Sequence, residues 1–213
     1  MPDPRRTWTW LLAGLAAVAL IAGGVAFWLA PDPAPMEEPI TGSSPVPSPT
    51  PTSPLVVEVG RVEEIAVGGR LDRGDIRTAV GSVRDTLTSL YTTAFVEPTG
   101  WAGGRFPQLG RSFAGDARVE SRRDVKDLTL GPTARELEAV RPRRARVNMR
   151  ILVGAEGRPI STIVLMEFRA TGLGPTIGEI PIQHQGRYVL RPVEGRWLVV
   201  AYDVRGHLGT GGR

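Results

Sequence analysis

The chain contains no cysteine, which excludes disulfide bonds and thiolate metal sites. Histidine is scarce as well: the only two, His184 and His207, cannot make a convincing metal site, and no cofactor is expected. The sequence also lacks a phosphate-binding loop, a dinucleotide-binding fingerprint and a His-Glu-x-x-His motif. Any folded domain in this chain must therefore be held together by its apolar core alone.

Charge is missing from residues 7–30, which read TWTWLLAGLAAVALIAGGVAFWLA. As a helix rising ~1.5 Å per residue, this run is roughly 36 Å long, enough to cross ~30 Å of hydrocarbon. Arg5 and Arg6 precede the run, and no further Lys or Arg occurs before Arg61. Since positive charge stays on the cytoplasmic side, residues 1–6 are predicted to be cytoplasmic and the C-terminal part extracytoplasmic. The sequence thus predicts a single-pass protein of the cell membrane.

The alternative interpretation of the same run is a cleaved signal peptide. Such a peptide has an apolar region of ~7–15 residues, followed by a small-x-small cleavage site. The run in this chain is longer and ends in Phe27-Trp28-Leu29-Ala30-Pro31, where bulky residues and a proline make a poor cleavage site. An uncleaved transmembrane anchor is the favoured prediction, and a chain trimmed after Ala30 would contradict it.

Residues 31–54 read PDPAPMEEPITGSSPVPSPTPTSP, which predicts a linker. Such a proline-rich segment cannot bury a core and favours extended polyproline geometry, with a reach of at most about 75 Å at ~3.1 Å per residue. The remaining chain has a length typical of one domain. We expect an extracytoplasmic domain over residues 55–205 and a flexible tail over residues 206–213.

Basic residues are concentrated in one short segment of this domain. It contains Arg141, Arg143, Arg144 and Arg146. These arginines are either a solvated strand edge or an anion-binding surface for lipid headgroups or acidic wall polymers. Nucleic acid is not expected as a partner, because the domain is predicted to lie outside the membrane.

Apolar residues between Asp75 and Phe95 recur at intervals of three and four, which predicts one long amphipathic helix. Asp72 or Asp75 can cap its start, and Pro98 ends it. The predicted apolar face consists of Ile76, Ala79, Val80, Val83, Leu87, Leu90, Tyr91, Ala94 and Phe95. A second, shorter helical stretch is predicted over residues 106–113.

The C-terminal half alternates between apolar and polar residues, which predicts β-strands. The predicted strands are residues 144–153, 160–170, 182–191 and 196–204, the last two forming a hairpin around residues 192–195. Shorter strands are predicted at residues 127–130 and, at the sheet edge, at residues 55–59. A long helix, smaller helices and then strands indicate an α+β fold, with the sheet curled over the helix.

Three features resemble the nuclear-transport-factor-2-like (SnoaL-like) superfamily, over roughly Asp72 to Arg205. They are the order of elements, the segment Ser112-Phe113-Ala114-Gly115-Asp116-Ala117-Arg118, and the closing strand Gly195-Arg196-Trp197-Leu198-Val199-Val200-Ala201-Tyr202-Asp203-Val204. With an anchor and a proline-rich spacer, the chain looks most similar to actinobacterial envelope proteins such as Mce-associated proteins. The resemblance implies a cone-like curled antiparallel sheet packed on one long helix, with a pocket between them. Members include enzymes, ligand binders and scaffolds, so the fold leaves the function open.

A candidate catalytic pair follows from the predicted hairpin. If residues 192–195 form a four-residue loop, His184 faces Asp203, and Tyr188 lies on the same face of the sheet. A histidine beside a carboxylate has its protonated form favoured and its ring oriented, and enzymes of the superfamily use His and Asp as acid or base. The alternative is a cross-strand polar pair that fixes the register. A loop of three or five residues would break the pairing.

Two functions are compatible with these sequence features. The favoured one is a non-enzymatic binding or scaffold module of the bacterial cell envelope, with a protein partner; a homodimer is a further expectation from the resemblance. The alternative is a small-molecule-binding protein or pocket enzyme using His184, Asp203 and Tyr188, which requires a deep cavity lined by these side chains. The observation that discriminates is whether the cone is open or is filled by its large side chains, namely Met149, Met166, Phe168 and Trp197.

Overall fold

The computed structural model describes residues 54–66, 72–97, 101 and 106–208, with side chains up to Gly206. The chain divides into two compact units, Met1–Pro47 and Ser48–Arg213, and the described residues all belong to the second. The predicted transmembrane helix (7–30) and nearly all of the linker lie outside the described residues. Within the described residues, no helix is long and apolar enough to cross a membrane.

Helix α1 (Arg73–Tyr91) is the long helix that the sequence predicts, and the short π-helix η1 (Thr92–Val96) continues it. Asp72 caps α1, because its Oδ1 accepts hydrogen bonds from the backbone N–H groups of Gly74 at 2.6 Å and Asp75 at 3.2 Å. The predicted apolar face is buried except for Val80, which is half-buried. The spacing of apolar residues therefore identified both the helix and its packed side.

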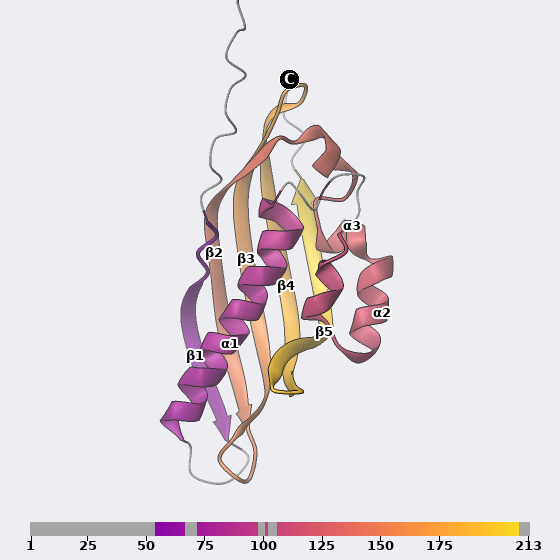
Figure 1. Ribbon diagram of the computed structural model, residues 1–213. Helices are drawn as coiled ribbons and strands as arrows, with labels where there is room; N and C mark the ends of the chain where they lie inside the picture. The colour runs from indigo at the N-terminus through magenta and orange to yellow at the C-terminus, as the bar shows by residue number, and fades with distance from the viewer. Residues whose placement is uncertain (1–53, 67–71, 98–100, 102–105, 209–213) are drawn as a thin grey trace, which may run out of the picture. The chain divides into compact units, whose positions relative to one another are not determined.

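Five strands form one curled open sheet in the order β1-β2-β3-β4-β5 (Figure 1). They are β1 (Glu58–Ala66), β2 (Ala139–Val153), β3 (Pro159–Gly174), β4 (Gly178–Val193) and β5 (Arg196–Leu208). Neighbours from β2 to β5 pair antiparallel, but β1 pairs parallel with β2. The α+β class is confirmed, whereas the expected antiparallel sheet is a mixed one. The parallel pairing is possible because α1 lies within the long connection between β1 and β2.

The helices lie on one side of the sheet, which we call its inner face (Figure 1). Besides α1 they are η4 (Leu109–Ser112), α2 (Gly115–Arg123), α3 (Val125–Leu128) and η5 (Gly131–Glu136). Helices α2 and α3 pack beside β5, where the Tyr202 hydroxyl donates to Asp124 Oδ2 at 2.9 Å. The strand predicted at residues 127–130 is wrong, since α3 occupies the start of that segment and Thr129 ends it by donating to the Val125 carbonyl at 2.6 Å.

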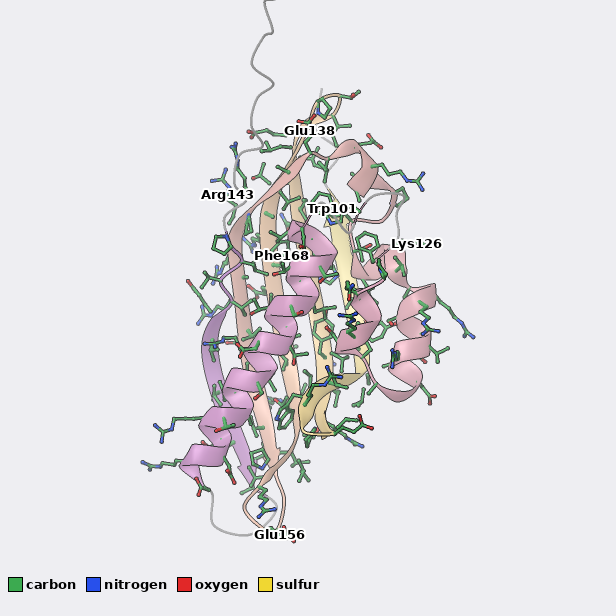
Figure 2. All side chains as sticks on the ribbon, in the orientation of Figure 1. Trp101, Lys126, Glu138, Arg143, Glu156 and Phe168 are labelled. Atoms are coloured by element: carbon green, nitrogen blue, oxygen red, sulfur yellow. The ribbon has the colours of Figure 1, made fainter. Side chains whose placement is uncertain are left out.

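One large cluster of buried apolar residues, with a smaller one of Ile76, Ile151 and Val153, fills the space between α1 and the inner face. Met149, Met166, Phe168 and Trp197 are all buried in it. The ring centroid of Phe168, labelled beside α1 in Figure 2, lies 5.5 Å from that of Tyr91 and 5.2 Å from that of Phe95. These four side chains, which were named as the ones able to close the cone, therefore do occupy its interior.

The hairpin between β4 and β5 differs from the predicted one in two ways. Its loop is the pair Glu194-Gly195, with φ of 50° and 78°, which is the two-residue turn that matches strand twist. A bulge then leaves Val200 unpaired, because Leu190 pairs with Val199 and Val189 with Ala201. Both changes shift the predicted register.

Candidate functional site

Three polar side chains at the centre of the core, Tyr91, Tyr188 and His184, form one hydrogen-bonded network. The Tyr91 hydroxyl lies 2.8 Å from His184 Nδ1 and 3.1 Å from the Tyr188 hydroxyl. On the other side of the imidazole, Nε2 lies 3.1 Å from the backbone carbonyl oxygen of Asp127. This hydrogen-bonded network thus links α1, β4 and the end of α3 through the centre of the domain.

The direction of each hydrogen bond follows from the Asp127 carbonyl, which can only accept. His184 must carry its proton on Nε2 in order to donate to that carbonyl, so Nδ1 is an acceptor. Tyr91 then donates to Nδ1, and Tyr188 donates to the Tyr91 oxygen. Every polar atom of this hydrogen-bonded network has a partner when the imidazole is neutral.

Burial determines the charge state of these groups. Desolvation lowers the pKa of His184 to about 4, although its hydrogen bond to the Asp127 carbonyl acts in the opposite direction. Burial likewise raises the pKa of both Tyr91 and Tyr188 above the usual range. At neutral pH the three side chains are therefore uncharged, and none is poised to exchange a proton with solvent.

Aromatic rings close the surroundings of His184. Its ring centroid lies 4.8 Å from that of Phe95 and 5.4 Å from that of Tyr91, the latter in an edge-to-face arrangement of 76°. The exposed fraction of His184 is 1%, and that of Tyr91 is 0%. A substrate has no surface access to the imidazole, so this arrangement serves to fix α1 on the sheet.

The predicted pair of His184 and Asp203 is not assembled. In the observed register, His184 lies opposite Gly206, and Asp203 lies opposite Arg187. Asp203 is exposed, on the face of the sheet opposite to the core. Tyr188 does join His184, but only through Tyr91, which was predicted as part of the apolar face of α1 and not as a site residue.

The arginine cluster lies at the end of the sheet where the chain enters β1, since Glu58 pairs with Arg146. Arg144 lies directly opposite Arg169 of β3, and a bulge next to Arg144 releases Arg143, whose Nε donates to Thr171 Oγ1 at 3.3 Å. Figure 2 shows Arg143 beside β2, away from α1. The structure thus extends the predicted cluster to a neighbouring strand.

The side of the sheet that faces away from the helices, its outer face, has apolar residues at its centre. Ile163 is 43% exposed and Leu165 is 49% exposed, two residues apart on β3. A hollow of about 480 Å³ lies over them, with Arg61, Arg150 and Arg187 at its border. Because Ile163 and Leu165 are adjacent on one face and lie beside a hollow, they make this face the candidate interaction surface.

A second, smaller hollow of about 290 Å³ adjoins the first and shares Leu165 and Arg187 with it. Asp203 and Arg205 of β5 border this second hollow. The outer face therefore presents a concave strip that runs from β1 to β5 across the strands.

Among the described residues, no group of three or more His, Asp or Glu side chains could hold a metal ion. No protein-family model matches the chain, and no curated protein matches it either. The fold places the domain in the broad class of α+β proteins with a curled, open, mixed sheet. The candidate functional site within it is the outer face, and not the buried histidine.

Proposed function

We propose that this protein is a membrane-anchored binding module that displays its α+β domain outside the cytoplasmic membrane and holds a protein partner of the cell envelope. The anchor and spacer are read from residues 7–30 and 31–54. The resemblance to nuclear-transport-factor-2-like envelope proteins supports the same role. The single observation that carries the binding role is the pair of exposed aliphatic residues, Ile163 and Leu165, on the uncovered face of the sheet.

The buried histidine favours this proposal over a pocket enzyme. An acid-base residue must reach the proton that it transfers, directly or through one water. His184 is enclosed by aromatic rings, and Asp203, its predicted partner, lies on the other face of the sheet, so the two cannot act on one substrate. The polar groups of the domain interior therefore have a structural role, and other molecules bind at the domain surface.

The topology can be tested by thiol labelling, because the natural chain has no cysteine. Val119→Cys introduces one thiol at an exposed site of α2, and Asp3→Cys introduces one before the predicted anchor. In intact cells, a membrane-impermeant maleimide should label the first variant only. Labelling of Val119→Cys that appears only after lysis, or recovery of a chain trimmed after Ala30, contradicts the proposed anchoring.

The binding role requires a second measurement. The photo-crosslinking residue p-benzoylphenylalanine is placed in the full-length chain at Leu165 in one variant and at Val119 in another. Irradiation of intact cells should give a defined protein adduct from at least one position. If neither position gives a protein adduct, the domain is not a binding module.

A further inference from the structure

The outer face combines an aliphatic centre with a surplus of arginine. We infer that it docks a segment of another protein which presents aliphatic side chains flanked by carboxylates. This inference rests on the proposed binding function, and it specifies the face that binds and the chemistry of the partner. Its support comes from side chains on all five strands of the sheet.

The aliphatic centre provides the first half of the recognition. Ile163 and Leu165 point to the same side of β3, and their spacing along the strand is roughly 6.7 Å. Val189 lies directly opposite Ile163 on β4 and extends the apolar area sideways. The hollow above Ile163 and Leu165 has a volume of about 480 Å³, so aliphatic side chains of a docked segment can enter it.

Arginines provide the second half, because they outnumber the carboxylates of the outer face. The arginines are Arg61, Arg141, Arg144, Arg146, Arg150, Arg169, Arg187, Arg191 and Arg205, whereas the carboxylates are Glu58, Glu63, Glu167, Glu179 and Asp203. Arg150 forms an ion pair with Glu63 at 3.0 Å. Within the described part of the chain, no other arginine of this face has a carboxylate at ion-pair distance.

The pair Arg144 and Arg169 shows most directly that the outer face favours a partner with carboxylates. Two like charges directly opposite each other on neighbouring strands destabilise the sheet. A carboxylate placed between them would relieve this repulsion and accept bidentate hydrogen bonds from the guanidinium groups. The favoured partner segment therefore carries Asp or Glu at one end of its aliphatic stretch.

Two other occupants fit the charges less well. A second copy of this chain would bring another surplus of arginines into the same interface, with few free carboxylates to meet it. An anionic lipid surface would meet Glu63, Glu167 and Asp203, which lie on the same face close to the aliphatic centre. An acidic protein segment can avoid these carboxylates by its shape, and a lipid surface cannot.

The test uses the full-length chain in intact cells, with p-benzoylphenylalanine at Leu165 and mass spectrometry of the crosslinked peptide. We expect an adduct to a partner peptide that contains aliphatic residues and an excess of Asp and Glu. Arg144→Glu combined with Arg169→Glu should lower the adduct yield at least ~10-fold, because the two reversed charges repel the carboxylates of the partner segment. The matched control, Arg122→Glu combined with Arg123→Glu on α2, should leave the yield unchanged.

The remaining outcomes overturn the inference. These are an adduct with a second copy of the chain, an adduct with lipid, an adduct with a peptide that is not acidic, and a yield that both double variants change equally. Protein adducts from Val119 alone would overturn it too, yet leave the proposed binding function standing. Circular dichroism of each variant establishes that a loss of yield does not come from unfolding.

Discussion

His184 should make the stability of the domain depend on pH in a defined window. Its pKa is about 4 in the folded domain, and the usual value of 6.5 applies to the unfolded chain. Between these values the unfolded chain binds a proton that the folded domain excludes, so the free energy of unfolding rises with pH. The contribution is complete above pH 6.5 and is lost as the pH falls towards 4.

The size of this effect follows from the shift in pKa. A difference of about 2.5 units corresponds to roughly 3 kcal/mol, lost mostly between pH 6.5 and 4. In the middle of this window the slope should approach one proton, or about 1.4 kcal/mol per pH unit. This is a large part of the total stability of a small domain, which is usually about 5–15 kcal/mol.

The assay is urea unfolding of residues 48–213 at several pH values, for the natural sequence and for His184→Gln. The variant removes the titration, and the difference between the two slopes isolates the histidine from the carboxylates that titrate nearby in pH. NMR of the imidazole gives an independent value, since the chain has only two histidines and one His207 variant assigns both. Equal slopes for the two proteins, or an imidazole of His184 that titrates near pH 6.5, would refute a buried neutral histidine.

Three substitutions can be tested by urea unfolding, two of them in the packing around the same histidine and one on α1. Tyr91→Phe leaves His184 Nδ1 and the Tyr188 hydroxyl without their shared partner and should cost about 1–3 kcal/mol. Gly186→Ala should also destabilise the domain, because a Cβ there would lie 2.7 Å from the Tyr188 hydroxyl oxygen. Gly81→Ala should instead stabilise it by about 0.5–1 kcal/mol, since nothing lies within 4 Å of the added Cβ on α1. A Gly186→Ala domain as stable as the natural one would contradict the close approach of the Tyr188 ring.

The elements that could be predicted from the sequence are those with one clear apolar side. The three- and four-residue spacing on α1 and the alternation from Val147 to Val153 on β2 both identified the buried side chains. Helix α2 was missed because it is mostly charged and buries only Ala117 and Ser121. Two small buried residues do not make a recognisable amphipathic pattern. The buried side of α2 is defined only by its contact with β5.

The register of β5 could not be read for a related reason. The segment Leu198-Val199-Val200-Ala201 is apolar throughout, so alternation does not show where a bulge inserts an extra residue. The loop was equally ambiguous, because residues 192–195 fit a four-residue turn as well as the observed pair Glu194-Gly195. Because of these two uncertainties, the prediction placed His184 opposite Asp203. In the structure, His184 lies opposite Gly206.

Strand β1 shows a third limit. Its sequence EVGRVEEIA has adjacent glutamates and no regular alternation, so the predicted edge strand covered residues 55–59 and missed most of it. Its pairing depends on β2, about ninety residues later in the chain, through contacts such as Arg61 N–H to Asn148 Oδ1 at 2.9 Å. The arginines of the candidate interface were visible in the sequence, but the aliphatic pair beside them was recognised only when the sheet showed which side the helices leave uncovered.

The strand directions also decide how this protein can be tagged. Because β1 runs parallel to β2 and β5 runs antiparallel to β4, the chain enters β1 and leaves β5 at the same end of the sheet (Figure 1). A fluorescent protein fused directly after β5 would be attached at the end of the sheet where β1 begins. The turn around Glu156 lies at the opposite end of the sheet (Figure 2). An epitope inserted there would be accessible without contacting the end where the chain enters β1.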